Sequence, residues 1–289
     1  MMTYRQAWRR WDVDCLLVTT DPGALVTARA VADQVMDAAD DAISSFQPGS
    51  EIRRLRPGWN DISPVLAGFL RAALEAARTT DGAVDPTLGH EVRAWREGRP
   101  HLVDRAGSWR DVRLDGWRLH LPAGMLLDLG ATGKAYAADL IARRTAQETG
   151  AGVLVGLGGD LASAGRGPAR GWQVTVQDTS HDVPATVTLH DGWSVATSST
   201  QRRRVDDGDP RSHHVLDPET GMPASTRWRT ATVVARRCST ANAAATAAIV
   251  KDATAPTWLT RHGYDARLVE QSGLTLTLGG FPADLAVAS

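Results

Sequence analysis

The sequence contains little cysteine and little lysine. Cys15 and Cys238 are its two cysteines and lie far apart along the chain, which leaves neither a disulfide framework nor a cysteine zinc site. Each is expected to behave as a small buried hydrophobe. Lysine also occurs twice, at Lys134 and Lys251, so arginine carries almost all the positive charge. This scarcity draws attention to Lys134, which follows a glycine.

The sequence also lacks long apolar runs and a strong net charge. No stretch reaches the roughly 18 apolar residues that a membrane-spanning helix needs. The N-terminal residues show no signal-peptide pattern and no lipoprotein-type cysteine. The formal net charge is −1, so no long-range field attracts nucleic acid or anionic lipid. We therefore expect a cytoplasmic protein with no nucleic-acid partner and no membrane insertion.

Hydrophobic periodicity predicts a mixed fold. Apolar residues recur every three or four positions from Ala24 to Phe46, which predicts a long helix. Ser63 as N-cap and Pro64 as first helical residue predict a second helix, to about Ala77. Further helices are expected at 134–147 and 240–250, and strands at 13–19, 125–129, 153–157, 172–177, 185–189, 230–235 and 274–278, with short strands around a turn at 115–116. Because helices and strands do not alternate regularly, we expect an α+β domain with a mostly antiparallel sheet.

The segment from Thr80 to Gly89 contains two aspartates, two glycines and a proline. A loop that ends the preceding helix would explain this composition. Alternatively, Asp85 and the surrounding backbone amides are presented to a ligand. The residues alone leave both interpretations open.

The segment Asp128-Leu-Gly-Ala-Thr-Gly-Lys134 is expected to connect a strand to a helix. Gly130 and Gly133 would let backbone atoms approach a ligand closely. Free amides at the helix start favour an anion, and Lys134 adds a point charge. The spacing matches neither a Walker-A loop nor a dinucleotide-binding glycine motif. An anion site therefore competes with a plain strand–helix turn.

Two adjacent histidines, His213 and His214, precede a turn that begins at Asp217. Histidine can act as a general base near neutral pH. One histidine of such a pair is expected to be exposed and inert. Asp217 could simply cap its own turn.

Asn242 and Thr246 are four residues apart in an alanine-rich segment. A helix places them on one face, where both offer neutral oxygen ligands suited to magnesium. The plainer interpretation is a tightly packed helix that Ser239 or Thr240 caps.

The order of these segments is more informative than any one of them. The series runs through 45–55, Gly82-Ala-Val-Asp85-Pro-Thr, Asp128 to Lys134 with Tyr136 and Asp139, Gly158-Gly-Asp160, Ala196-Thr-Ser198, His214-Val-Leu-Asp217-Pro with Thr220-Gly221, and Ala241-Asn242 with Thr246. In this order it resembles the ApbE family of FAD:protein FMN transferases, from about residue 8 to about residue 280.

The resemblance implies a fold and an activity. The expected fold is a single α+β domain over 1–289, T-fold-like, with a mostly antiparallel sheet core, helices and an added subdomain. The expected enzyme uses Mg²⁺ to cleave the pyrophosphate of FAD. It attaches the FMN half to a threonine of an acceptor protein and releases AMP. Some relatives instead hydrolyse FAD to FMN and AMP.

The resemblance also assigns roles to residues. Those expected to contact FAD are Phe46 at the flavin, Ala83, Val84 and Asp85 on the adenosine side, Asp128 and Lys134 near the nucleotide, and Leu216 through its backbone. His214 matches the histidine proposed to deprotonate the acceptor threonine. The expected magnesium ligands are the backbone carbonyl of Ala131 and the side chains of Asn242 and Thr246.

Position 242 departs from the family pattern, which normally has Asp there. Asn keeps an oxygen but loses the charge, and this should weaken Mg²⁺ binding. The family's second acidic option near the metal falls at Ala245, so it does not replace the lost carboxylate. Three interpretations follow: an active FMN transferase, an FAD pyrophosphatase or weakly active paralogue, and a flavin-binding protein that has lost catalysis.

Overall fold

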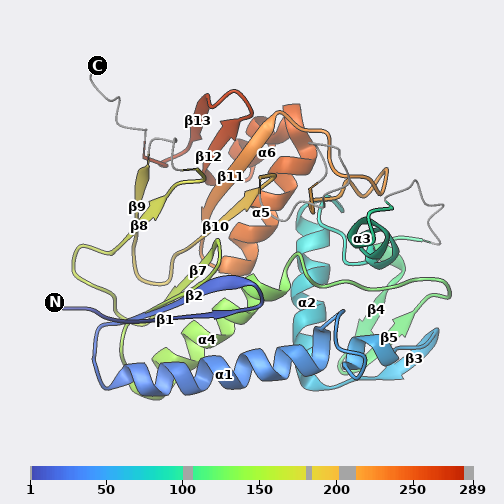
Figure 1. Cartoon of the computed structure of the whole chain (residues 1–289), viewed down its shortest axis with the longest axis horizontal. Helices are drawn as coiled ribbons and strands as arrows, with labels where there is room; N and C mark the ends of the chain where they lie inside the picture. Colours follow the sequence, from blue (N-terminus) through green and yellow to red (C-terminus); the bar gives the residue numbers. More distant parts are fainter. Residues whose placement is uncertain (1, 100–106, 180–183, 202–212, 283–289) are drawn as a thin grey trace.

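The computed structural model describes residues 2–99, 107–179, 184–201 and 213–282. Its largest element is an eight-stranded sheet in the order β1-β2-β6-β7-β10-β11-β12-β13. Every neighbouring pair in this sheet is antiparallel. The strands are β1 Tyr4–Arg10, β2 Val13–Thr19, β6 Val153–Leu157, β7 Asp160–Ala164, β10 Ser194–Ser199, β11 Trp228–Ala235, β12 Asp265–Glu270 and β13 Thr275–Leu278. The expected α+β fold with a mostly antiparallel sheet is thus confirmed (Figure 1).

Six α-helices accompany this sheet within the described residues. They are α1 Ala24–Ile43, α2 Pro64–Thr79, α3 Gly89–Arg96, α4 Gly133–Thr149, α5 Cys238–Lys251 and α6 Ala255–Arg261. Helix α4 packs on β6 and β7, and α5 packs on β10 and β11. Because α5 also contacts α2 and α4, it is enclosed from several sides. Its alanines suit this position, since small side chains allow neighbouring elements to approach closely.

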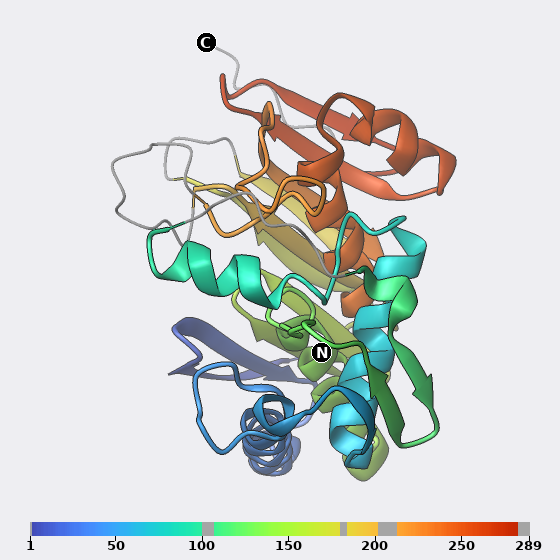
Figure 2. The same cartoon turned by 90° about the vertical axis from the view of Figure 1, so that its right-hand side faces the viewer.

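Two smaller sheets also lie within the described part of the chain. Strands β3 Gly58–Asp61, β5 Arg118–Leu121 and β4 Arg113–Asp115 form a three-stranded sheet. It lies beyond α2, on the side away from β1 and β2 (Figures 1 and 2). The expected turn joins β4 to β5, with Gly116 at a φ of 56°. The hairpin of β8 Trp172–Val176 and β9 Ala185–Leu189 forms the third sheet and alternates buried and exposed residues as predicted.

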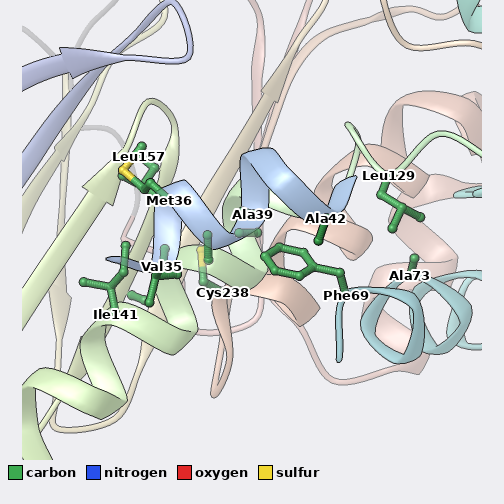
Figure 3. Packing of buried hydrophobic residues seen from close by; sticks show 14 of the residues in the cluster. Val35, Met36, Ala39, Ala42, Phe69, Ala73, Leu129, Ile141, Leu157 and Cys238 are labelled. Carbon is green, nitrogen blue, oxygen red and sulfur yellow. The ribbon is translucent and has the colours of Figure 1, made fainter. Parts of the chain in front are cut away.

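The main hydrophobic core lies between the large sheet and helices α1, α2 and α4. Met36, Phe69, Ile141 and Leu157 come from four different elements and belong to one buried cluster (Figure 3). Full burial of each such side chain contributes roughly 1.5–3 kcal/mol. Cys238 is part of the same cluster, which confirms the prediction that it is a buried hydrophobe.

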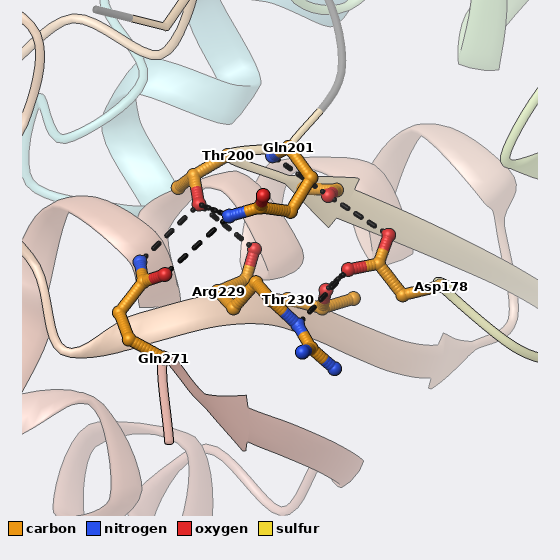
Figure 4. A network of polar contacts seen from close by, with 7 residues as sticks. Asp178, Thr200, Gln201, Arg229, Thr230 and Gln271 are labelled. Atoms are coloured by element: carbon orange, nitrogen blue, oxygen red, sulfur yellow. Dashed lines mark hydrogen bonds and ion pairs between the residues drawn. The ribbon is translucent and has the colours of Figure 1, made fainter. Parts of the chain in front are cut away.

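Buried polar groups pair where β10 ends. Asp178 accepts hydrogen bonds from Ser199 and Thr230 and forms an ion pair with Arg229 at 3.3 Å. The Thr200 hydroxyl donates to the Arg229 carbonyl oxygen at 3.2 Å (Figure 4). These bonds satisfy groups that would otherwise be costly to bury, and they join the ends of β10 and β11.

The predicted strand at 125–129 is wrong. Leu126 forms a single parallel bridge to Leu88, and the Asp128 N–H donates to the carbonyl of Pro86 at 2.9 Å. The stretch therefore runs beside residues 86–89 rather than in a sheet. Its apolar pattern is real, because Leu127 and Leu129 are buried in the core, but burial alone does not distinguish a strand from an extended loop.

The first helix is shorter than predicted. It ends at Ile43, and Ser44 is extended. The Ser44 hydroxyl then accepts hydrogen bonds from the N–H groups of Phe46 and Gln47, at 3.3 and 3.2 Å. Such local serine bonds compete with helix continuation. As a result, Phe46 lies on a loop.

No helix in the described part of the chain is long and apolar enough to cross a membrane.

Candidate functional site

Helix α5 is positioned by a carboxylate from α4. Asp139 accepts hydrogen bonds from the N–H groups of Cys238 and Ser239, at 2.8 and 3.0 Å, and from the Ser239 hydroxyl at 2.7 Å. A carboxylate at a helix N-terminus satisfies free amides and complements the helix dipole. The helix has no cap from its own side chains, so the expectation of a Ser239 or Thr240 cap is wrong.

The first turn of α5 is a dry, charged environment for the Cys238 thiol. Burial raises its pKa well above the usual value, and the nearby carboxylates of Asp160 and Asp139 act in the same direction. Lys134 opposes them. The thiol stays protonated at neutral pH, so Cys238 is not a nucleophile.

Asn242 is a buried polar residue of α5, with 6% of its surface exposed. Its amide Nδ2 donates to Oδ1 of Asp160 on β7 at 3.0 Å. Its own Oδ1 is buried and has no hydrogen-bond partner among the described residues. A buried acceptor left without a donor costs about 1–3 kcal/mol. A cation or a ligand donor at this oxygen would remove that cost.

The other predicted metal residues lie on the same helix or at the start of α4. One turn after Asn242, the Thr246 hydroxyl is hydrogen-bonded to Ser198 of β10 at 2.9 Å. Ala131 is exposed in the turn before α4. Lys134, in the first turn of α4, places Nζ 3.8 Å from Oδ2 of Asp160. In the described residues no three His, Cys, Asp or Glu side chains group to hold a metal.

The segment at Asp85 is both a helix-ending loop and a neighbour of α5. Thr80 ends α2, and its hydroxyl accepts the N–H of Val84 at 3.1 Å. Val84 packs with Ala243 and Ala247 of α5, and Ala83 lies against the same cluster. This contact brings the segment beside the helix that carries Asn242 and Thr246.

The Asp85 carboxylate itself is buried. Its Oδ1 accepts hydrogen bonds from the Thr87 N–H at 2.8 Å and the Thr87 hydroxyl at 2.6 Å. This local turn fixes the backbone ahead of Leu88. Leu88 then meets Leu126, which explains why the Asp85 and Asp128 segments run side by side.

Arg96 connects the Asp128 segment to Phe46. Its guanidinium lies 4.5 Å from the centre of the Phe46 ring and donates to the Ser45 hydroxyl at 2.8 Å. It also forms an ion pair with Asp128 at 3.3 Å. Phe46 is nevertheless 74% exposed. The sequence patterns did not predict α3, which carries Arg96, because its short apolar pattern has no clear start or stop signal.

The two histidines have different environments. His213 is buried, its Nε2–H points at the Ala224 carbonyl oxygen at 3.1 Å, and its Nδ1 accepts the Val215 N–H at 3.3 Å. The expectation that one histidine of the pair is exposed is therefore wrong for His213, whose ring is buried and hydrogen-bonded through both nitrogens. His214 is partly exposed, and its ring centre lies 6.5 Å from that of Trp95.

Leu216 joins the histidine segment to the rest of the site. It packs in a small buried cluster with Leu88 and Trp95 and pairs with Pro223 through an isolated bridge. Asp217 accepts the N–H of Glu219 at 2.9 Å, so it does cap its turn. The structure thus gathers segments from four distant parts of the sequence around α5 and α3.

Comparison with known proteins identifies first the fold and then the family. The fold matches the flavinyl transferase ApbE of Pseudomonas stutzeri, in its apo form, with a TM-score of 0.81 and 22% identity over 96% of this chain and 94% of that one. The family model described as ApbE family matches residues 9–268. The chain belongs to the ApbE family.

Two relatives show how far the sequence similarity extends. The FAD:protein FMN transferase of Salmonella typhimurium is 30% identical over 233 residues, which cover 69% of this chain and 64% of that protein. The protein of the same name from Chlamydia trachomatis is 30% identical over 247 residues, covering 78% of this chain and 76% of its own length. The matched part therefore spans about two thirds to three quarters of these relatives.

Proposed function

We propose that this protein transfers the FMN half of FAD to a threonine of an acceptor protein and releases AMP. The observation that carries the proposal is the convergence of the Asp85, Asp128 and His214 segments around α3 and α5. The Salmonella and Chlamydia relatives are both named FAD:protein FMN transferase, which is also an activity of flavin transfer.

The residues around Asn242 fit a magnesium ion. The buried Oδ1 of Asn242 needs a partner, and oxygen atoms are the ligands that Mg²⁺ prefers. Asn242, Thr246 and the carbonyl of Ala131 would hold the ion, with FAD phosphate oxygens as further ligands. When bound, Mg²⁺ would neutralise charge on the pyrophosphate.

Residues on either side of α5 would bind the two halves of FAD. Ala83, Val84 and Asp85 would contact the adenosine side through a backbone that α5 and Thr87 hold in place. Lys134 would add positive charge near the phosphates at the start of α4. Two further contacts would come from Asp128 near the nucleotide and from the backbone of Leu216.

Phe46 would contact the flavin ring. Arg96 already stacks on this phenyl group, so one face of the ring is covered. An aromatic pair contributes about 0.5–1.5 kcal/mol beyond the burial of its surface area. Stacking of the exposed Phe46 ring on the flavin would therefore strengthen FAD binding.

His214 would accept the proton of the acceptor threonine hydroxyl. Its partial exposure would let a protein substrate reach it, whereas both ring nitrogens of His213 are hydrogen-bonded within the protein. Proton removal by a positioned base accelerates such reactions by about 10² to 10⁴.

FAD pyrophosphatase activity is the second candidate. The observation that favours it is Asn242, whose amide carries no charge to strengthen the metal site. Water would then replace the threonine as the attacking group. If the metal site were too weak to support either reaction, the protein would bind flavin without catalysis.

One experiment separates these candidates. The purified protein is incubated with FAD and Mg²⁺, with and without an acceptor that carries the family's target threonine motif. We expect covalent flavin fluorescence on the acceptor and release of AMP. Release of FMN and AMP without transfer would favour the pyrophosphatase, and intact FAD would contradict both activities.

A further inference from the structure

The carboxylate of Asp160 is an acidic partner of the Asn242 amide. It lies at the start of β7, is 3% exposed and accepts the Asn242 Nδ2 hydrogen at 3.0 Å. Lys134 lies 3.8 Å from its other oxygen, and this ammonium offsets part of the cost of burying the charge. The structure thus links a cation, a carboxylate and an amide across α4, β7 and α5.

This arrangement fixes the orientation of the amide. A carboxylate accepts hydrogen bonds and does not donate them, whereas an amide has one donating and one accepting end. Asn242 must therefore turn its nitrogen toward Asp160, which leaves Oδ1 at the opposite corner. That oxygen is the buried atom without a hydrogen-bond partner among the described residues.

We propose that Asp160 is the positioning residue of the metal site. Through its hydrogen bond to Asn242 it supplies the negative charge that position 242 lacks. It orients Oδ1 of Asn242 as a ligand and polarises the amide toward a cation. In this chain the carboxylate that contacts Asn242 lies on the neighbouring strand. This inference rests on the metal site of the proposed function and names the residue on which that site depends.

The same hydrogen bond would also serve a purely structural purpose, because it ties α5 to β7. The two roles differ in their consequences. A structural bond affects the unfolding temperature alone. A positioning bond also affects metal affinity, and loss of such outer partners typically weakens metal binding by about 10- to 100-fold.

The test titrates Mn²⁺ alone into the purified full-length protein and measures free Mn²⁺ by electron paramagnetic resonance. Asp160→Asn preserves the size of the side chain but removes its charge. It also allows the Asn242 amide to flip, so that Oδ1 and Nδ2 exchange places. We expect it to weaken Mn²⁺ binding by about 10- to 100-fold. The double variant Asp160→Asn with Asn242→Asp returns a carboxylate to the helix and should recover at least the affinity of the unaltered protein.

Asp139→Asn is the matched control, since it removes another buried carboxylate that holds α5. It should lower the unfolding temperature and leave Mn²⁺ affinity within about twofold, well short of the loss that an outer partner of the metal causes. Unchanged Mn²⁺ binding in Asp160→Asn would overturn the inference while leaving the metal site in place. A folded double variant as weak as Asp160→Asn would overturn it too. No Mn²⁺ binding by the unaltered protein would overturn the proposed metal site itself, and the role of Asp160 with it.

Discussion

The two sides of the candidate site are built differently. The side on α5 is buried and bonded to regular elements: Asn242 is 6% exposed and bonded to β7. The opposite side lies on loops: Phe46 is 74% exposed, and the Arg96 guanidinium lies over its ring. Groups on strands and helices are placed more accurately than groups on loops. We therefore expect the proposed metal side to be preformed and the proposed flavin side to be adaptable.

The largest expected effect tests the adaptable side. His214→Ala should reduce transfer to the acceptor by about 10² to 10⁴, because the threonine hydroxyl would lose the base proposed for it. Release of AMP from FAD without acceptor should fall much less. In-gel flavin fluorescence measures the first quantity, and chromatography of AMP the second.

His213→Gln is the control for this variant. It disturbs a buried, bonded ring, so it should lower the unfolding temperature. The transfer rate of this variant, measured well below its unfolding temperature, should stay within a few-fold of the rate of the unaltered protein. If His213→Gln abolished transfer and His214→Ala did not, the two assignments would be reversed.

The next effect tests the preformed side. Asn242→Asp places a charged ligand where the amide oxygen now lies, and charge strengthens oxygen sites for Mg²⁺. We expect the Mg²⁺ concentration for half-maximal turnover to fall by roughly tenfold. Asn242→Leu, whose side chain has no oxygen, should raise the Mg²⁺ concentration needed for half-maximal turnover. No gain from Asn242→Asp would mean that charge at this position does not limit the enzyme.

A structural effect comes third. Asp139→Asn removes the carboxylate that caps α5 from another helix, and loss of a cap costs about 0.5–2 kcal/mol. For a chain of this size, 1 kcal/mol shifts the unfolding temperature by roughly 2–4 °C. Differential scanning calorimetry should detect the change. The control Asp37→Asn affects an exposed ion pair with Arg10, and a shift as large as that of Asp139→Asn would contradict the capping role.

The regular elements of the preformed side were largely predictable. The helix carrying Asn242 and Thr246, and the strand at 153–157, follow from apolar patterns that the structure confirms. The tertiary partners were not predictable. Asp139 caps a helix about 100 residues away, and Asp160 bonds Asn242 across 82 positions, so no local spacing reveals either contact.

The adaptable side was harder to predict. The stretch 125–129 has the apolar pattern of a strand, yet it pairs with Leu88 through one bridge. Helix α1 ends at Ile43 because Ser44 bonds the following amides, although the apolar pattern continues to Phe46. Loops that are brought together by long-range contacts leave no periodic hydrophobic pattern in the sequence, so local spacing does not predict them. The ordered motifs predict a candidate site in these loops, which hydrophobic periodicity could not do.

The smallest expected effect concerns the ring at this adaptable side. Phe46→Ala should weaken FAD binding by about 0.5–1.5 kcal/mol, the range for an aromatic contact. The unfolding temperature should not change, because the ring is largely exposed. Fluorescence titration with FAD measures the affinity, and Phe46→Tyr, which keeps the aromatic face, should bind like the unaltered protein. A fall in stability without loss of affinity would show that Phe46 serves the fold rather than the flavin, and the contrast between the two sides would then fail.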